Sequence, residues 1–298
     1  MEIVKLKSEK DNLELEVCIS TPKGKPKGIV QISHGMTEHK ERYYSFMKYL
    51  NSKGYVSIIH DHRGHGASVK SMEDHGYFYT NDTSYIRDDL YLVTKYIKDR
   101  YKDLDIALFS HSMGTLVARN YLKVYDNEID KLILCGPPTR NGLVDVAIIL
   151  AKIACLFSSK RPNRLLNNLS VGSYNKKFDT KGAWLSSDEK EVYKYSKDPL
   201  SGFTFTSNGF LNLFKMLKEV YIKKDYKVNN KSLPILVIAG EDDPVIDSID
   251  KFNDLVKFLK ELGYKKVSSK IYKGKRHELL NEINRKEVYE DIVKFISK

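Results

Sequence analysis

The sequence predicts an α/β fold in which a mostly parallel β-sheet is covered by helices on both faces. Six short apolar segments are typical of buried strands: 28–33, 55–60, 105–110, 131–136, 234–240 and 266–272. Most of them are followed by a polar loop and a helical pattern. Near-continuous apolar strands that alternate with helices indicate a parallel sheet, because both faces of such a sheet are buried. Ligands of these sheets bind beyond the carboxyl ends of the strands.

The first twenty residues follow a different pattern. Segments 2–7 and 13–19 alternate apolar and polar residues with a period of two, on either side of the turn-forming sequence SEKDN. We therefore expect an antiparallel hairpin ahead of the parallel strands. The chain contains no internal repeat, low-complexity tract or Pro/Gly-rich linker, which argues against a string of separate domains.

The segment from 140 to 230 interrupts the alternation of strands and helices. It contains no clear parallel strand, and the sequence GLVDVAIILAKIACLF at 142–157 is apolar almost all round a helix. We predict that residues 1–139 and 231–298 form the core and that 140–230 is an inserted helical cap over the carboxyl edge of the sheet. The simplest expectation is that the apolar helix is buried between cap and sheet. The alternative is that it lines an acyl-chain tunnel or touches a membrane surface, because basic residues follow it in SSKRPNR.

Composition argues against several classes of protein. The formal charge of +11 comes from lysines spread along the chain and interleaved with acidic residues, so we expect a solvated surface rather than a nucleic-acid-binding patch. Three scattered cysteines, Cys18, Cys135 and Cys155, are expected to be free thiols. No apolar run reaches the roughly 20 residues needed to span a bilayer, and the N-terminus lacks the pattern of a secretory signal. These features predict a cytoplasmic protein, which would be peripheral to a membrane if the apolar helix touches one.

The sequence SHSMG at 110–114 is a candidate catalytic turn. A nucleophilic serine must stand clear of the backbone and beside a base, and a tight strand-turn-helix with small residues two positions before and after the serine achieves this. Ser112 has Gly114 on one side and Ser110, instead of the usual glycine, on the other. A strand candidate precedes this turn and a helical pattern follows it, as the mechanism requires.

A carboxylate and then a histidine should follow such a serine in the chain. His277 comes after the last strand candidate and is the only histidine beyond residue 111, which makes it the candidate base. The candidate acid is Asp243, in the loop after the strand at 234–240, and two neighbouring aspartates compete with it: Asp242 and Asp247. The carboxylate would hold the useful tautomer of His277 while His277 takes the proton of Ser112.

Backbone N–H groups that could bind an oxyanion are predicted at two positions. One is Met113, directly after the serine. The other is Met36, in the loop after the strand at 28–33, where Gly35 lets the backbone approach closely.

The histidine-rich sequence HDHRGHG at 60–66 superficially suggests a metal site. Its two glycines, however, indicate a tight turn that polar side chains can hold in place by hydrogen bonds. We expect no metal and no cofactor, since a serine hydrolase needs neither.

Five motifs together give the chain a resemblance to the α/β-hydrolase superfamily, and within it to the monoacylglycerol lipase and lysophospholipase-like (serine aminopeptidase-like) branch. They are HGMTEH at 34–39, DHRGHGAS at 61–68, SHSMG at 110–114, GEDDPV at 240–245 and RHELLNE at 276–282. They follow the order of the family and extend over most of the chain. The resemblance implies an eight-stranded, mostly parallel sheet with a helical cap after the sixth strand. It also favours Asp243 as the acid, because the family has a glycine, two residues and then an aspartate.

The predicted function is that of a serine carboxylester hydrolase acting on single-chain lipid esters, monoacylglycerols or lysophospholipids, through an acyl-serine intermediate. Three alternatives stay open. A small-ester carboxylesterase would use the same residues. An aminopeptidase-type serine peptidase would need a cap carboxylate to hold the ammonium group of its substrate, and the candidates are Asp179, Asp188, Glu189 and Glu191. A catalytically disabled binding protein would not need all three catalytic residue types.

Overall fold

Eight strands form one sheet in the computed structural model, which describes all 298 residues. The strands are β1 (Glu2–Lys7), β2 (Glu14–Ser20), β3 (Gly28–Ser33), β4 (Tyr55–His60), β5 (Ile106–His111), β6 (Lys131–Cys135), β7 (Pro234–Gly240) and β8 (Lys266–Tyr272). Their order across the sheet is β1, β2, β4, β3, β5, β6, β7, β8. β2 pairs antiparallel with β1 and with β4, and all other pairs are parallel. The predicted hairpin and the predicted mostly parallel sheet are confirmed.

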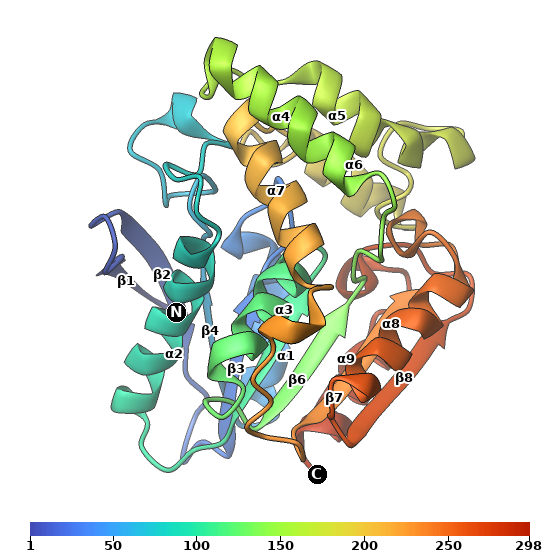
Figure 1. The fold of residues 1–298 in the computed structure, drawn as a ribbon. Helices are drawn as coiled ribbons and strands as arrows, with labels where there is room; N and C mark the ends of the chain where they lie inside the picture. Colours follow the sequence, from blue (N-terminus) through green and yellow to red (C-terminus); the bar gives the residue numbers. More distant parts are fainter.

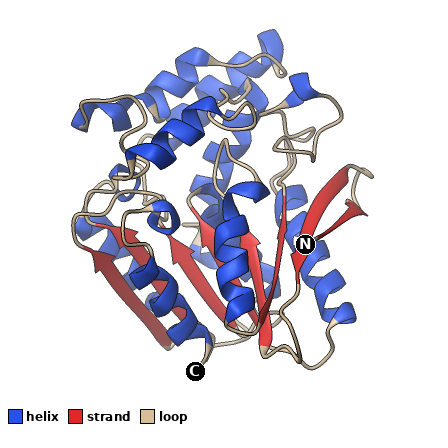
Figure 2. Ribbon diagram, turned by 180° about the vertical axis from the view of Figure 1, so that it is seen from behind, coloured by secondary structure: helices blue, strands red, loops and turns tan.

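Helices cover both faces of the sheet (Figure 1 and, from behind, Figure 2). One core contains side chains of α2 (Ser84–Arg100), α3 (Met113–Tyr125) and α8 (Ile249–Glu261), and the other contains side chains of α1 (Tyr44–Ser52) and α9 (Lys286–Ile296). Every residue of β3, β4 and β5 is buried, because successive side chains of a strand point to opposite faces and each face has a core. Burial on both faces explains why these strands are nearly continuous apolar segments in the sequence.

Four helices lie between β6 and β7 in the chain: α4 (Val144–Ser158), α5 (Arg164–Ser170), α6 (Glu189–Lys197) and α7 (Ser207–Glu219). In Figure 1, α4, α5 and α6 lie above the carboxyl ends of the strands, and α7 packs against both α4 and α3. This segment contains no strand of the sheet. The boundaries of the cap, 140 and 230, stay a prediction.

The apolar helix α4 is only partly buried. Ile148 and Ala151 are its only buried residues, whereas Leu156 and Phe157 are 86% and 87% exposed. The expectation of a helix buried between cap and sheet is therefore wrong: α4 packs on α7 on one side and has no protein partner over its outer face. Neither α4 nor any other helix has the length and apolar character needed to cross a membrane.

All three cysteines are free thiols. Cys18 and Cys135 are buried, and Cys155 is partly exposed. Burial raises the pKa of each thiol. Because the thiolate is the reactive form, none of the three has the environment of a nucleophilic cysteine.

Candidate active site

The turn between β5 and α3 places Ser112 in an unusual backbone conformation. Its φ of 51° and ψ of −119° lie outside the conformations that residues with a side chain normally adopt. The N–H of Ser112 donates to the carbonyl oxygen of Cys135 at 2.9 Å, and the N–H of Thr115 donates to the carbonyl oxygen of Ser112 at 2.9 Å. These bonds hold the turn, and the strand-turn-helix predicted from the sequence is present.

The two small residues that flank Ser112 have different surroundings. A Cβ atom at Gly114 would lie 2.6 Å from the carbonyl oxygen of His34 and closer still to that of Ser33, because α3 begins directly against the end of β3. At the other position, the hydroxyl of Ser110 is buried and donates to the carbonyl oxygen of Ile133 at 2.9 Å. The turn therefore requires glycine at 114 and accommodates the serine that departs from the usual motif at 110.

His277 and Asp243 form a buried pair. The Nδ1 atom of His277 lies 2.9 and 3.0 Å from the two carboxylate oxygens of Asp243, and both side chains are almost inaccessible to solvent. The N–H of Val245 donates to the Oδ1 of Asp243 at 2.8 Å, which orients the carboxylate. With Nδ1 committed to the carboxylate, the Nε2 atom is the one available for proton transfer.

The two competing aspartates are not buried beside His277. Asp242 is exposed, and Asp247 is exposed and pairs with Lys251. Of the three candidates named from the sequence, the structure brings only Asp243 to His277.

The remaining predicted positions converge on the same place. Ser112, His277, Met36 and Met113 all line one cavity. A Cβ atom at Gly35 would lie 3.2 Å from the Cβ of Ser112, so the backbone of the Gly35–Met36 segment passes directly beside the serine. Met113 is the first residue of α3, where the backbone N–H has no partner within the helix.

This cavity has a volume of about 1100 Å³ and a largely apolar wall. Side chains of α4, α5 and α7 contribute to the wall, among them Val144, Ala147, Leu150, Leu166, Leu213, Phe214 and Leu217. The Trp184 ring lies 5.2 Å from the His277 ring, centroid to centroid. The volume slightly exceeds the range typical of small-molecule sites, roughly 300–1,000 Å³, and is large enough for a molecule with a long apolar chain.

The histidines of the sequence HDHRGHG are buried and uncharged. The rings of His62 and His65 pack against His34, with the ring centroids of His34 and His62 4.5 Å apart, and the ring of His60 packs against His62. Burial lowers the pKa of His60 and of His65 to about 3. No group of three or more potential ligand side chains in the protein is arranged to hold a metal ion.

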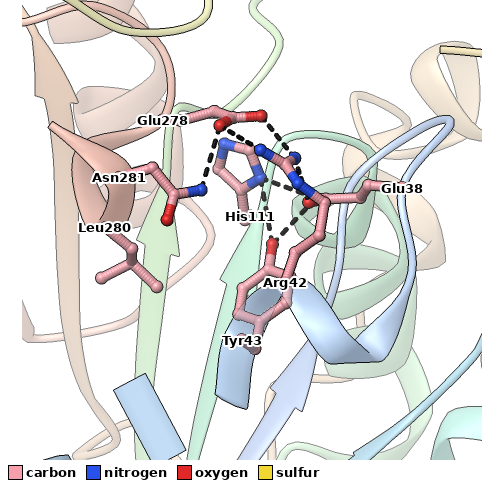
Figure 3. Close-up of a pocket in the computed structure, with 7 residues that line it drawn as sticks. All are labelled: Glu38, Arg42, Tyr43, His111, Glu278, Leu280 and Asn281. Carbon is pink, nitrogen blue, oxygen red and sulfur yellow. Dashed lines mark hydrogen bonds and ion pairs between the residues drawn. The ribbon is translucent and has the colours of Figure 1, made fainter. Parts of the chain in front are cut away.

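Sequence reasoning missed a second group of charged residues beside the site. Arg42 makes ion pairs with Glu38 at 2.9 Å and with Glu278 at 2.6 Å, and each of the three side chains is at most 10% exposed (Figure 3). Glu38 and Glu278 lie inside two of the motifs quoted above, but spacing alone does not reveal that Arg42 joins them. The sequence did offer one signal of this group: Glu38 lies two positions after the predicted Met36, and Glu278 directly follows the predicted His277.

Comparisons with known proteins identify the family of the chain. The family described as serine aminopeptidase, S33, matches residues 24–284. The chain belongs to this family. The predicted resemblance to the α/β-hydrolase superfamily and to its monoacylglycerol lipase-like branch is thereby confirmed.

Relatives within and around this family include named lipases and esterases. The chain is 29% identical to a monoglyceride lipase homolog of Monkeypox virus, over 91% of this chain and 88% of the relative. It is 28% identical to the monoglyceride lipase of Homo sapiens, over 88% of this chain and 79% of that protein. A thermostable carboxyl esterase from Bacillus coagulans, crystallised with glycerol, superimposes with a TM-score of 0.90 at 27% identity and covers 99% of this chain and 97% of its own.

The close approach at Gly114 predicts the effect of a single added methyl group. We expect Gly114→Ala to lower the free energy of unfolding by about 3 kcal/mol, because the new Cβ meets main-chain oxygens that cannot move aside. Gly142→Ala is the matched control: a Cβ there meets nothing within 4 Å, so a change within about 0.5 kcal/mol is expected. Urea unfolding followed by circular dichroism measures both. Equal stability of the two variants would contradict the packing argument.

Proposed function

We propose that the protein is a serine carboxylester hydrolase that cleaves single-chain lipid esters, with monoacylglycerols as the preferred class. The observation that carries the proposal is the buried pair of Asp243 and His277. His277 lines one large, largely apolar cavity together with Ser112, which lies at a turn of unusual backbone conformation. Membership of a hydrolase family and the names of the relatives support it.

In the proposed mechanism, His277 takes the proton of the Ser112 hydroxyl as the serine oxygen attacks the ester carbonyl carbon. Asp243 holds the imidazole in the required tautomer and stabilises the imidazolium. The N–H groups of Met36 and Met113 bind the negative oxygen of the tetrahedral intermediate. Collapse of this intermediate breaks the ester bond, the leaving alcohol takes the proton from His277, and Ser112 carries the acyl group.

Water completes the cycle in the same site. His277 removes a proton from a water molecule as the water oxygen attacks the acyl-serine carbonyl. Collapse of the second tetrahedral intermediate returns the proton to Ser112 and releases the fatty acid. No metal or cofactor takes part in any of these steps.

The cavity supports a lipid ester over a small ester. Its volume of about 1100 Å³ exceeds what an acetyl or butyryl ester needs, and its apolar wall would bury an acyl chain at about 0.8 kcal/mol for each methylene. A lysophospholipid is the second candidate, because Arg140, Lys177 and Lys181 also line the cavity and would attract a phosphate group.

The aminopeptidase alternative has little support from the cavity. None of the four cap carboxylates named from the sequence lines it. The acidic side chains that do line it are Glu38, Asp247 and Glu278, and each is already paired with a cationic side chain. A substrate ammonium group would find no unpaired carboxylate there.

The outer face of α4 supports contact with a lipid surface. Exposed apolar side chains gather on α4 and α5: Val146, Ile149, Leu150, Ile153, Leu156, Phe157, Leu165 and Leu169. Exposed basic side chains lie beside them in the chain, at Lys152, Lys160, Arg161 and Arg164. Val146, Leu150 and Leu169 also line the cavity. An acyl chain could therefore pass from a membrane into the site along a continuous apolar path.

A panel of p-nitrophenyl esters tests the substrate class. We expect the ratio kcat/KM to rise from acetyl to medium and long acyl chains, because each added methylene finds apolar surface in the cavity. Assays with 1-monoacylglycerol, lysophosphatidylcholine and aminoacyl amides then compare the head groups. Activity confined to acetyl and butyryl esters would indicate a small-ester carboxylesterase, and cleavage of the amides alone would indicate a peptidase.

Substitutions test the three catalytic roles. We expect Ser112→Ala to abolish turnover and labelling by a fluorophosphonate probe, and Asp243→Asn to lower kcat by about 10⁴-fold, because the amide would hold the wrong tautomer of His277. Asp242→Asn is the matched control and should retain wild-type kcat, since that side chain is exposed. A large loss in Asp242→Asn, or fluorophosphonate labelling of Ser112→Ala, would contradict the assignment.

Charge placed on the outer face of α4 tests the membrane contact. We expect Leu156→Asp and Phe157→Asp each to lower the affinity for phospholipid vesicles, measured by co-sedimentation, by about tenfold or more. The reason is that each variant no longer buries one large apolar side chain in the lipid. Ile3→Asp changes an exposed apolar residue at the far edge of the sheet and should bind vesicles as the wild type does. Unchanged binding of both α4 variants would rule out this face as the contact.

A further inference from the structure

Four side chains from three separate parts of the chain form one buried charged cluster behind the site. They are Glu38, Arg42, His111 and Glu278, and Figure 3 shows them pointing toward one another. The guanidinium of Arg42 donates to both oxygens of Glu278 at 2.6 Å and to Glu38 at 2.9 Å. Only Arg42 among the four does not line the substrate cavity. Its influence on the reaction must therefore pass through its partners.

One side of the cluster holds the loop that contains Met36. The Oε1 atom of Glu38 accepts a hydrogen bond from the N–H of Gly35 at 2.5 Å and another from the hydroxyl of Tyr43 at 2.8 Å. These bonds hold the His34–Gly35 peptide, at the point where the backbone passes beside Ser112. The next peptide carries the Met36 N–H, and its carbonyl oxygen, that of Gly35, lies 2.8 Å from the Nδ1 atom of His34. The direction of the Met36 N–H therefore depends on the peptide that Glu38 anchors and on this contact with His34.

The other side holds the loop that contains His277. Glu278 is the next residue, and its fork-to-fork pairing with Arg42 fixes both the position and the plane of its carboxylate. The side chain of Asn281 donates to the same carboxylate at 3.0 Å. His111, the residue before Ser112, places its Nε2 atom 3.3 Å from the carbonyl oxygen of His277. The cluster therefore reaches the three segments that carry the reacting groups.

Charge balance within the cluster assigns a proton to His111. Two buried carboxylates against one guanidinium would leave a net negative charge away from water, which is costly. The Nδ1 atom of His111 lies 3.1 Å from the Oε1 of Glu38, and its Nε2 faces a carbonyl oxygen. The Tyr43 hydroxyl also lies 3.2 Å from Nδ1, but it donates its one proton to Glu38 at 2.8 Å and so meets the ring as an acceptor. With acceptors facing both ring nitrogens, both nitrogens donate, as only the imidazolium can.

The groups that face His111 agree with this assignment. Those with charge or a titratable proton are Glu38, Arg42 and Tyr43 from the Met36 side, and Asp243, His277 and Glu278 from the other side. Burial lowers the pKa of His111, but the hydrogen bond and the charge of Glu38, together with the charges of Glu278 and Asp243, raise it by more, and the net shift is upward. The imidazolium is therefore retained as the pH rises past about 6.5 and is lost only when the pH passes through the raised value.

We propose that Glu38, Arg42, His111 and Glu278 act as one positioning cluster, in which a guanidinium and an imidazolium balance two carboxylates, and which fixes the Met36 N–H and His277 relative to Ser112. The inference rests on the function proposed above. Arg42 is its centre and touches no substrate. Loss of its forked geometry would displace groups on both sides of the scissile bond, and a misplacement of about 1 Å costs on the order of 100-fold in rate.

Arg42→Lys tests the cluster, because lysine keeps the charge but cannot bridge two carboxylates with a planar fork. The matched control is Arg63→Lys: Arg63 is fully buried and also pairs with two carboxylates, Asp11 at 3.0 Å and Asp89 at 2.7 Å, away from the cavity. On a p-nitrophenyl ester, we expect Arg42→Lys to lower kcat about 100-fold with KM within about threefold. Arg63→Lys should keep kcat within about twofold of the wild type, even if it lowers Tm as much as Arg42→Lys does.

Equal kcat in the two lysine variants, or a higher KM at unchanged kcat, would overturn the proposal. If Arg42→Lys does not fold, Glu278→Gln replaces it, since glutamine has the same shape and removes one of the two charges that Arg42 holds. That variant should lower kcat about tenfold, and an unchanged kcat would overturn the proposal equally. A wild-type chain without Ser112-dependent hydrolysis would overturn the proposed function and, with it, this inference.

Nitrogen NMR of the histidine rings reads the charge of His111 without reference to activity. At about pH 6.5, where an ordinary histidine is half protonated, we expect His111 to be mostly protonated on both ring nitrogens in the wild type. The signals are assigned by their absence in His111→Asn. In Glu38→Gln, which removes the carboxylate that faces the ring, His111 should lose its proton at a lower pH. A neutral His111 in the wild type at this pH would overturn the charge balance.

Discussion

The backbone conformation of Ser112 is the constraint on which the rest of the candidate site depends. A positive φ at a residue with a side chain costs on the order of 1–3 kcal/mol and persists only where the surroundings impose it. Here β6 accepts the N–H of Ser112, and α3 begins so close to β3 that a methyl group at Gly114 would collide with main-chain oxygens. The turn therefore exists only when β3, β5 and β6 lie in register and α3 is docked on them.

The parallel strands supply the other groups for the same reason. The loops after β3, β5, β7 and β8 carry Met36, Ser112, Asp243 and His277, and the carboxyl ends of parallel strands meet at one edge of the sheet. Asp243 and His277 are 34 positions apart in the chain, yet β7 and β8 pair directly and bring them within hydrogen-bonding distance. The geometry of the pair is thus a property of the sheet rather than of either loop alone.

This dependence explains how much the sequence alone could predict. Strands, the turn at Ser112 and the choice of His277 each follow from local patterns, and the six apolar segments match β3 to β8 within a residue at either end. Arg42 and Glu278 are 236 positions apart, and no local pattern links them. The burial of α4 could not be predicted either, because a helix that is apolar all round has no periodicity to show which side faces the protein.

Two departures from ordinary burial lie on opposite sides of the same cavity. Behind the site, four ionisable side chains are buried where apolar residues would cost less, and in front of it α4 exposes apolar side chains that water solvates poorly. Neither arrangement is explained by stability. The buried charges give directional bonds that hold loops in place, and the exposed apolar face matches a lipid phase. Both arrangements fit the proposed function, in which an apolar substrate would enter from one side while the polar groups of the site are held rigid from the other.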